Sequence, residues 1–595
     1  MRKDEKMKTR NEIPEQYKWR LEDIYQTEEQ WEAEYRQLEE ALPRLEALKQ
    51  GIASSAQALE KGLQEIYSAS LLLERLYVYA RMRRDEDNAN SYYQGLADRA
   101  QSIEVKFSSA TSFLNPLLLS LPEGVLEEYA RQENLAQYRF MLEDLLRSRA
   151  HVLKEGEERL LSMAGDFSGG AQGIFTMLNN ADLSFGSVEH ESKTYPLTHA
   201  SYIQLMQSED RELRKKVFYQ FYQSFQSHIN TIAAIYGTSV KKDVFYARAR
   251  GYESSLAAAL FSDNVPKSVY SELIQKVHEH LPTMYRYVAL RQRILGVEQL
   301  EMYDIYAPLV RQAEVKYSYE QAQQLVLEGL SVLGEEYISH LKEAFCSGWI
   351  DVFENQGKTS GAYSWGAYGT HPYVLLNHRE DLDSVFTIAH ELGHAMHSYY
   401  SDAAQPYPTA GYAIFVAEVA STVNEILLTK HLLRTVQDEK LKKYILNHYI
   451  DQFRTTVLRQ TMFAEFEMKA HEMAEAGAPL TVESMCKVYG ELNALYHGPK
   501  MGADPTISYE WARIPHFYNA FYVYKYATGF SCACAIVKKL EEEPDMLKRY
   551  RAFLSSGGSD YPVELLRKAG IEVGEAVEIC MKEFAEALKE FEALA

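Results

Sequence analysis

Apolar residues recur at spacings of three and four along most of this 595-residue chain, which is the pattern of amphipathic helices. Thr27 to Gln30 read as a capping box ahead of an apolar stripe that starts at Trp31, and Gly51 marks the end of that helix. Further helices are predicted at residues 59–82, 92–107 and 126–153. The chain is therefore expected to be mainly α-helical, beginning with a helical array.

One short segment interrupts the helical pattern in the first half of the chain. Residues 183–197 contain Gly186 and Pro196 on either side of a brief alternation of polar and apolar side chains. This pattern predicts a β-hairpin at a domain boundary. We therefore predict an N-terminal helical region at residues 1–195 and a second domain at residues 196–595, which carries the motifs described next.

Residues 385–397 read as one helix that carries the pattern His-Glu-x-x-His at His390, Glu391 and His394. Asp381 or Asp383 can cap this helix. Its apolar stripe lies on the side away from the histidines and is formed by Val385, Ile388, Leu392, Ala395 and Tyr399. The regular stripe indicates that both histidines project from the same side of a packed helix.

This spacing suits a zinc ion. Residues four apart lie about 6 Å apart along a helix axis, so His390 and His394 can coordinate one tetrahedral ion. Glu391 lies roughly 100° round the helix, where it cannot be a third ligand but can act as general base toward the attacking water. Zinc lowers the pKa of that water and polarises the peptide carbonyl. The pattern predicts a zinc peptidase; the alternative is two histidines on a solvated helix face.

A catalytic zinc ion needs a third protein ligand, and the next predicted helix offers one. The otherwise apolar segment 415–428 carries Glu418 and Glu425, and carboxylates on so apolar a helix are seldom left unpaired. We predict that Glu418 is the third ligand of one zinc ion per chain, and that Glu425 fixes the tautomer of one histidine. His397 is a rival ligand, disfavoured because three successive turns of one helix converge poorly on a tetrahedral ion.

A small sheet is predicted just before the histidine helix. Residues 349–353 and 373–376 read as strands, and a stretch rich in glycine and aromatic residues separates them at 361–369. Peptidases can hold the substrate backbone as an added strand at a sheet edge, which favours a substrate-binding role for this stretch. The alternative is an ordinary hairpin whose aromatic side chains only pack.

These segments resemble the thimet oligopeptidase family of zinc metallopeptidases, and within it most closely the bacterial oligoendopeptidase F group. The resemblance rests on residues 361–370, 390–397, 415–422, 514–529 and 556–559. It implies a mainly α, two-lobed, zincin-like helical fold with a small β-sheet beside the active-site helix. It also implies a deep substrate channel roofed by the N-terminal region.

The resemblance also assigns roles in the tyrosine-rich segment 516–526. It implies that Tyr524 donates a hydrogen bond to the tetrahedral oxyanion, assisted by His516 or Tyr522. Phe521 stands where the family pattern has a tyrosine, so this contact of the family does not carry over. The alternative is that the tyrosines of this segment only pack in the core.

Composition restricts the partners. The formal net charge of -21 argues against nucleic acid or an anionic membrane, and it leaves a preference for cationic peptides open. No apolar stretch approaches the length of a membrane span and the N-terminus lacks an apolar signal region, so we expect a cytoplasmic protein. The five cysteines, odd in number and never spaced Cys-x-x-Cys, argue against a disulfide framework.

The sequence as a whole predicts a zinc-dependent endopeptidase that hydrolyses internal bonds of unstructured oligopeptides with a water molecule activated by the metal. The predicted metal ligands are His390, His394 and Glu418, and the predicted catalytic residues are Glu391, Tyr524, His516 and Tyr522. The alternatives are a dipeptidyl carboxypeptidase on the same framework and a non-catalytic helical scaffold that binds peptides. Glu391 argues against the scaffold, because binding alone needs no carboxylate beside the first histidine.

Overall fold

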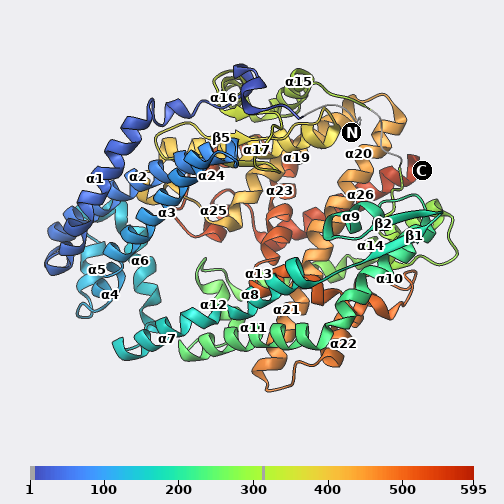
Figure 1. Ribbon diagram of the computed structural model, residues 1–595, viewed down its shortest axis with the longest axis horizontal. Coiled ribbons are helices and arrows are strands. Elements are labelled where there is room, and N and C mark those ends of the chain that lie inside the picture. The colour runs from blue at the N-terminus through green and yellow to red at the C-terminus, as the bar shows by residue number, and fades with distance from the viewer. Residues whose placement is uncertain (1–6, 311–314, 595) are drawn as a thin grey trace. The chain divides into compact units, whose positions relative to one another are not determined.

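The computed structural model describes residues 7–310 and 315–594. The chain forms two compact units, each assembled from separate stretches of sequence. Unit 1 comprises Met1–Ala150, Val315–His431 and Lys539–Gly570, and unit 2 comprises His151–Glu314, Leu432–Lys538 and Ile571–Ala595. Both units are mainly helical, which confirms the predicted fold class (Figure 1). The predicted division at residue 195 stays a prediction.

Unit 1 contains the N-terminal helices and both predicted metal-binding helices, the one with His390 and His394 and the one with Glu418. Its longer helices are α1 (Glu28–Ala47), α2 (Ala56–Glu86), α3 (Ser91–Thr111), α6 (Arg139–Ser148), α15 (Tyr319–Gly329), α16 (Glu335–Cys346), α17 (Leu382–Ala404), most of α19 (Ile414–Thr435) and α24 (Met546–Leu554). Shorter helices are α4 (Leu114–Leu119), α5 (Val125–Ala130), α18 (Tyr407–Ala410) and α25 (Pro562–Lys568).

Unit 2 is built in the same way from packed helices. They are α7 (Glu155–Ser168), α8 (Gly170–Met177), α9 (His199–Met206), α10 (Arg211–Ser227), α11 (Ile229–Ala249), α12 (Ser255–Phe261), α13 (Lys267–Glu279), α14 (Leu281–Leu295), α20 (Glu439–Gln452), α21 (Arg459–Glu475), α22 (Val482–His497), most of α23 (Tyr524–Glu542) and α26 (Val573–Leu594). Within the described residues, no helix is long and apolar enough to cross a membrane.

The predicted hairpin of unit 2 is confirmed. Strands β1 (Ser187–His190) and β2 (Lys193–Pro196) pair antiparallel, and the two residues between them, Glu191 and Ser192, have φ angles of 47° and 63°. Positive φ at both central residues is the geometry of a type I′ turn, which matches the twist of the flanking strands.

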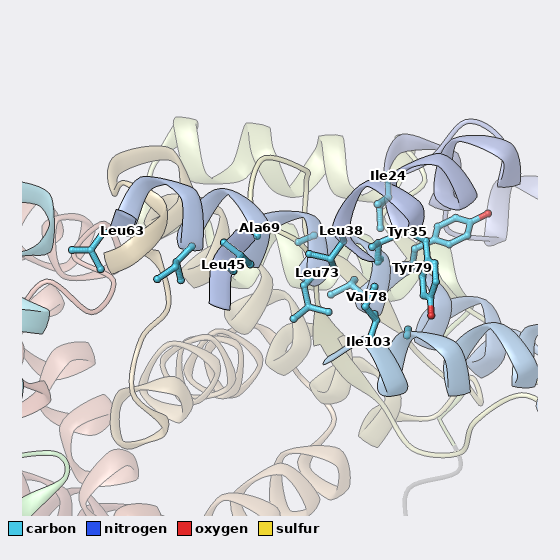
Figure 2. Close-up of a cluster of buried hydrophobic side chains, with 14 of the residues drawn as sticks. Ile24, Tyr35, Leu38, Leu45, Leu63, Ala69, Leu73, Val78, Tyr79 and Ile103 are labelled. Carbon is cyan, nitrogen blue, oxygen red and sulfur yellow. The ribbon is translucent and has the colours of Figure 1, made fainter. Parts of the chain in front are cut away.

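The first three helices of unit 1 share one apolar core. Figure 2 shows side chains from these helices meeting along α2, among them Leu38, Leu63 and Ile103. Burying each such side chain contributes about 1.5–3 kcal/mol. The same core includes Tyr373 and Leu375, so it attaches the small sheet to the N-terminal helices.

Two local predictions for the N-terminal helical array are wrong. Thr27 is the N-cap of α1, but its side chain makes no capping hydrogen bond and interacts with the Glu29 carboxylate instead. The Gln30 side chain accepts the Gln26 N–H at 2.9 Å, one residue before the N-cap. The single helix predicted at 126–153 is interrupted by a 3₁₀ turn at Glu133–Tyr138, where the Asn134 side chain bonds to α2 instead.

The small sheet has three strands, in the order β3 (Ile350–Asp351), β5 (Tyr373–Leu375) and β4 (Tyr363–Trp365). Strand β3 runs parallel to β5 and β4 runs antiparallel to it. The strands predicted at 349–353 and 373–376 are confirmed, whereas β4 was missed inside the glycine-rich stretch. Among the described residues β4 pairs only with β5, so its outer edge carries no neighbouring strand.

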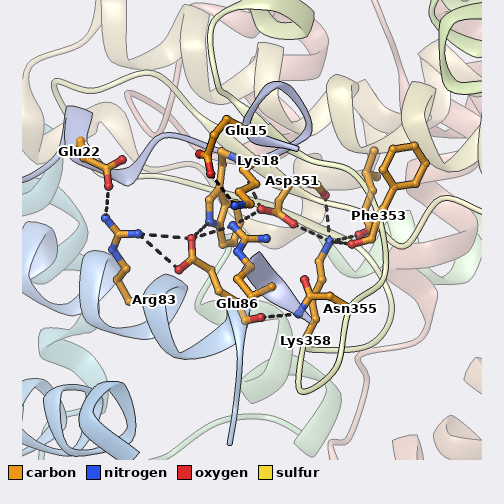
Figure 3. A network of polar contacts seen from close by, with 12 residues as sticks. Glu15, Lys18, Glu22, Arg83, Glu86, Asp351, Phe353, Asn355 and Lys358 are labelled. Atoms are coloured by element: carbon orange, nitrogen blue, oxygen red, sulfur yellow. Dashed lines mark hydrogen bonds and ion pairs between the residues drawn. The ribbon is translucent and has the colours of Figure 1, made fainter. Parts of the chain in front are cut away.

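A buried charge network around Asp351 fixes the N-terminal segment to this sheet (Figure 3). Arg10 Nη2 lies 2.5 Å from Asp351 Oδ2, and Lys358 Nζ lies 2.7 Å from Asp351 Oδ1. The side chains of Asp351 and Lys358 are both 0% exposed. Glu86, the last residue of α2, joins the network at 3.0 Å from Arg10 and accepts the Trp19 indole N–H at 2.7 Å.

The Asp351 carboxylate should contribute to stability at neutral pH. Burial alone raises the pKa of the Asp351 carboxyl, but the charges of Lys358 and Arg10 outweigh it and hold that pKa below its usual range. The stabilisation is therefore complete above the ordinary carboxyl pKa of about 3.9 and is lost as the pH falls further. We expect Asp351→Asn to lower the free energy of unfolding by about 3–5 kcal/mol, because it leaves the buried Lys358 ammonium without its paired carboxylate, whereas Arg10 keeps its ion pair with Glu86.

Urea unfolding at pH 7, followed by tryptophan fluorescence, measures this loss. The control is Glu15→Gln, which removes a carboxylate that is 89% exposed and pairs with Lys18 at the surface. The control should change the free energy of unfolding by less than about 0.5 kcal/mol. A loss below about 1 kcal/mol for Asp351→Asn would contradict the stabilising role of the network.

Candidate metal centre

Helix α17 presents the histidine motif on a well-anchored framework. Asp381 is its N-cap and accepts the Ser384 N–H at 2.8 Å, which resolves the two predicted capping candidates. The predicted apolar stripe is buried at Val385, Ile388, Leu392 and Ala395, and Tyr399 is half-buried. The helix therefore has one packed face and leaves His390 and His394 on another.

Helix α19 crosses α17 at an unusually short distance. A Cβ atom placed on Gly393 would lie 2.5 Å from Ser421 Cα and 2.7 Å from Ala420 O, so only glycine fits there. Close by, Asn424 Nδ2 donates a hydrogen bond to Ala389 O at 3.0 Å. Sequence reasoning missed the role of Gly393, although a glycine inside a helical pattern is a signal of close approach.

The close crossing brings three ligand atoms together in unit 1. His390 Nε2 and His394 Nε2 are 3.1 Å apart, and Glu418 Oε2 lies 3.5 Å and 3.7 Å from them. Ligand atoms bound at about 2.0–2.1 Å to a tetrahedral zinc ion are about 3.3 Å from one another. The triangle formed by two imidazole nitrogens and one carboxylate oxygen therefore fits the dimensions of a zinc site with one corner left open.

Each histidine also makes a contact outside the triangle of ligand atoms, and this contact orients its ring. His390 Nδ1 lies 2.5 Å from Glu425 Oε1, and His394 hydrogen-bonds the main chain of Ala417. Burial lowers the pKa of His390, but the bond to Glu425 and its charge raise that pKa to about 9. Burial and the proximity of His390 lower the pKa of His394. These opposite shifts favour protonation of His390 over His394 in the absence of metal, and binding a divalent cation requires release of that proton.

Glu391 lies beside the triangle and outside it. Its side chain is buried, with the residue 7% exposed, and the Ser364 main chain of β4 donates a hydrogen bond to its carboxylate. Burial raises the pKa of Glu391, His390 lowers it and Glu418 raises it, with a result of about 7. A carboxylate with this pKa can accept a proton and return it near neutral pH. The contact with Ser364 could not be foreseen because β4 was missed.

Two other histidine groups lie outside this site. His397 is 1% exposed, and its ring stacks on Tyr412 at 3.7 Å, so this rival ligand does not belong to the group of converging atoms. In unit 2, His190 and Asp210 approach at 2.6 Å next to Glu191 on the β1–β2 hairpin. Asp210 also caps α10, which accounts for its position without a metal.

The predicted oxyanion residues all lie in unit 2. Tyr524 is the first residue of α23, is 1% exposed and packs its ring 5.2 Å from that of Tyr270. Tyr522 is half-buried and His516 is exposed, and their rings lie 5.4 Å and 6.0 Å from the ring of Tyr526. Tyr522 and His516 thus keep accessible surface that Tyr524 lacks, and the roles of all three stay predictions.

Comparison with known proteins decides the family. The sequence profile of peptidase family M3 matches residues 204–582, and that of oligopeptidase F matches residues 118–185. The chain belongs to peptidase family M3. Its sequence is 44% identical over 598 residues to oligopeptidase PepF of Bacillus subtilis strain 168. The match covers 100% of this chain and 89% of the relative.

Further relatives agree. The chain is 40% identical to an oligoendopeptidase F homolog of Lactococcus lactis subsp. lactis, with 95% of each sequence covered. The crystal structure of oligoendopeptidase-F from Enterococcus faecium superposes with a TM-score of 0.74 at 37% identity, covering 95% of this chain and 99% of that one. The resemblance inferred from the motifs is confirmed, and this family M3 chain is a metallopeptidase that acts on peptides.

The close crossing of α17 and α19 generates a test. Gly393→Ala should force the two helices apart, which we expect to destabilise the protein by about 1–3 kcal/mol and to weaken metal binding at least about tenfold. Chelator competition measures the affinity for zinc. Gly95→Ala, in α3 with nothing within 4 Å of the added methyl, is the matched control and should stabilise by about 0.5–1 kcal/mol. Unchanged zinc affinity in Gly393→Ala would contradict the role of this contact.

Proposed function

We propose that this chain is a zinc-dependent endopeptidase that hydrolyses internal bonds of unstructured oligopeptides. The observation that carries the proposal is the convergence of His390 Nε2, His394 Nε2 and Glu418 Oε2, with the buried Glu391 carboxylate beside them. The donor set of two imidazoles and a carboxylate is one that catalytic zinc sites use. Relatives described as oligoendopeptidases support cleavage at internal bonds.

The mechanism assigns each residue of the centre one task. His390, His394 and Glu418 would hold the metal, and Glu425 orients the His390 ring by accepting a hydrogen bond from its Nδ1–H. A bound zinc ion would lower the pKa of a water molecule and polarise the carbonyl of the peptide bond. Glu391 takes the proton of the attacking water and delivers it to the leaving amine.

The open edge of β4 supports an extended substrate. A peptide that pairs with β4 forms main-chain hydrogen bonds, which give affinity without demanding a particular sequence. Ser364 of β4 also contacts Glu391, so a peptide at this edge would pass next to the general base. A segment must be free of other structure to pair in this way, which favours unstructured oligopeptides over folded proteins.

Product mapping separates this proposal from its alternatives. An unstructured peptide library should yield internal cleavages that disappear when a chelator removes the metal. Products that arise only as C-terminal dipeptides would indicate the dipeptidyl carboxypeptidase, and binding without cleavage would indicate the scaffold. A cytoplasmic location remains a prediction from the sequence.

Metal binding and proton transfer should be separable. Glu391→Gln should keep about one zinc ion per chain while lowering kcat by about 10²–10⁴, because it removes the proton carrier and leaves the ligands. His390→Ala, His394→Ala and Glu418→Ala should lose zinc, and Glu425→Ala should weaken zinc binding about 10–100-fold. Metal analysis and steady-state kinetics measure the two effects. If Glu418→Ala still bound a full zinc ion per chain and Glu425→Ala bound none, the ligand assignment would be reversed.

The oxyanion role can be assigned by kinetics. A donor aimed at the developing charge acts mainly in the transition state, so Tyr524→Phe should lower kcat by about 10²–10³ with little change in KM. Tyr518→Phe is the control, because Tyr518 is buried and stacks on Phe175 at 4.3 Å. If kcat stays near the wild-type value in Tyr524→Phe and falls severely in Tyr522→Phe, the oxyanion role belongs to the more accessible Tyr522.

A further inference from the structure

A cavity of about 570 Å³ lies within unit 1, next to the candidate metal centre, and the mechanism above does not use it. Its walls come from α2, from strand β4 with the residues that follow it, from the last turns of α17 and from residues 407–412. Binding sites for small groups usually have volumes of about 300–1,000 Å³. The cavity is therefore large enough for one long side chain of a substrate.

The cavity and the catalytic carboxylate share one residue of β4. Ser364 lines the cavity and its main chain also hydrogen-bonds Glu391. Trp365, the next residue along β4, lines the cavity as well. A peptide paired with the open edge of β4 would therefore pass both places within a few residues. Since side chains alternate between the two faces of a strand, one position near the cleaved bond can direct its side chain into the cavity.

Two carboxylates face this cavity, and none of the described residues that line it is a lysine or an arginine. Glu74 of α2 is held in place, because its Oε1 accepts the Tyr368 main-chain N–H at 3.0 Å and its carboxylate also bonds Tyr407. The side chain of Asp402, near the end of α17, makes no hydrogen bond or ion pair within the part of the chain that the structure describes. Partial burial, and then the charge of Glu74, raise the pKa of Asp402 to about 7.

Aromatic rings form much of the remaining wall. Tyr407 lies edge-on to Tyr67 at 6.1 Å and tilted against Tyr368 at 5.3 Å, and Trp365 and Tyr412 also line the cavity. Aromatic faces attract cations, more strongly where water is partly excluded. A carboxylate that is partly removed from water is stabilised by a nearby positive charge, and neither a lysine nor an arginine among the described lining residues supplies one to Asp402. Carboxylates and ring faces in one cavity together suit an ammonium or guanidinium group.

We propose that this cavity is a specificity subsite that binds the positively charged side chain of a lysine or arginine near the cleaved bond of the peptide. The inference rests on the proposed function, because a peptide on β4 is what brings the side chain there. An α-amino group offers the same chemistry as a lysine side chain, so the test must distinguish these two sources.

The test measures binding without turnover. Zinc-loaded Glu391→Gln is titrated with peptides of one common sequence in which lysine, norleucine or glutamate occupies each position in turn, with free or acetylated N-termini. Lysine should bind on the order of ten times more tightly than norleucine at one internal position, and glutamate more weakly than both, because a charge-assisted contact forms only with the cation. Acetylation should leave the preference intact; its loss on acetylation would assign the cavity to the peptide amino terminus.

Substitutions locate the preference. Adding Asp402→Asn should lower the ratio of lysine to norleucine affinity on the order of tenfold, and Asp402→Lys should turn the preference toward glutamate. Asp402 is the cleaner position, since Glu74→Gln also disturbs the bond to Tyr368. Glu65→Gln is the matched control, because it removes an equal charge from an exposed position on α2. Thermal unfolding verifies that each variant is folded.

The outcomes separate this inference from the proposed function. Equal affinity for lysine and norleucine at every position, or a preference that survives Asp402→Asn, would overturn the subsite. Cleavage by the wild-type protein without a charge preference would overturn the subsite alone. A charge preference in binding that depends on Asp402, in a protein that cleaves none of the peptides, would overturn the peptidase proposal and leave the subsite standing.

Discussion

The contact between Gly393 and the main chain at Ala420 and Ser421 determines the geometry of the metal centre. Two helices normally stand 8–10 Å apart because side chains separate them, and a glycine at the crossing removes that separation. The crossing lets Glu418 of α19 approach the two histidines of α17 to within 3.5–3.7 Å. Asn424 strengthens the same crossing by bonding a main-chain carbonyl of α17. Helix packing thus fixes a distance on which the chemistry depends.

Burial then gives the charged groups of this crossing their chemical properties. Desolvation raises the pKa of Glu391 to about 7, whereas the bond to Glu425 keeps a proton on His390. The same β4 strand that contacts Glu391 has an open edge and lines the cavity with Asp402. The proposed peptide site, general base and subsite are therefore neighbours around one short strand.

Local patterns in the sequence were sufficient for several of the helices, the hairpin and two of the three sheet strands. Periodicity predicts α17 because its apolar stripe is regular, and Asp381 stands where a cap is needed. Strand β4 was missed because its three residues lie among glycines and aromatics, and pairing with β5 is what makes them a strand. The helix expected at 126–153 failed because Asn134 bonds to α2, a contact that periodicity does not encode.

Contacts between distant residues explain what else the sequence did not reveal. Glu74 and Asp402 are far apart along the chain, so their shared cavity follows from packing alone. The convergence of His390, His394 and Glu418 could be predicted because their spacing along two neighbouring helices limits the possibilities. Tyr524 and Tyr522 are only two residues apart in a tyrosine-rich segment, so the local sequence does not distinguish them. Packing does distinguish them, because it buries Tyr524 fully and Tyr522 only partly.

The central claim is that two histidines and one carboxylate hold a zinc ion where α17 and α19 cross. X-ray absorption at the zinc edge, on the full-length protein loaded with one zinc ion per chain, tests it most directly. The account predicts two imidazole nitrogens at about 2.0–2.1 Å, a carboxylate oxygen at about 2.0–2.2 Å, and no sulfur. Three imidazoles, or a sulfur ligand at about 2.3 Å, would contradict it.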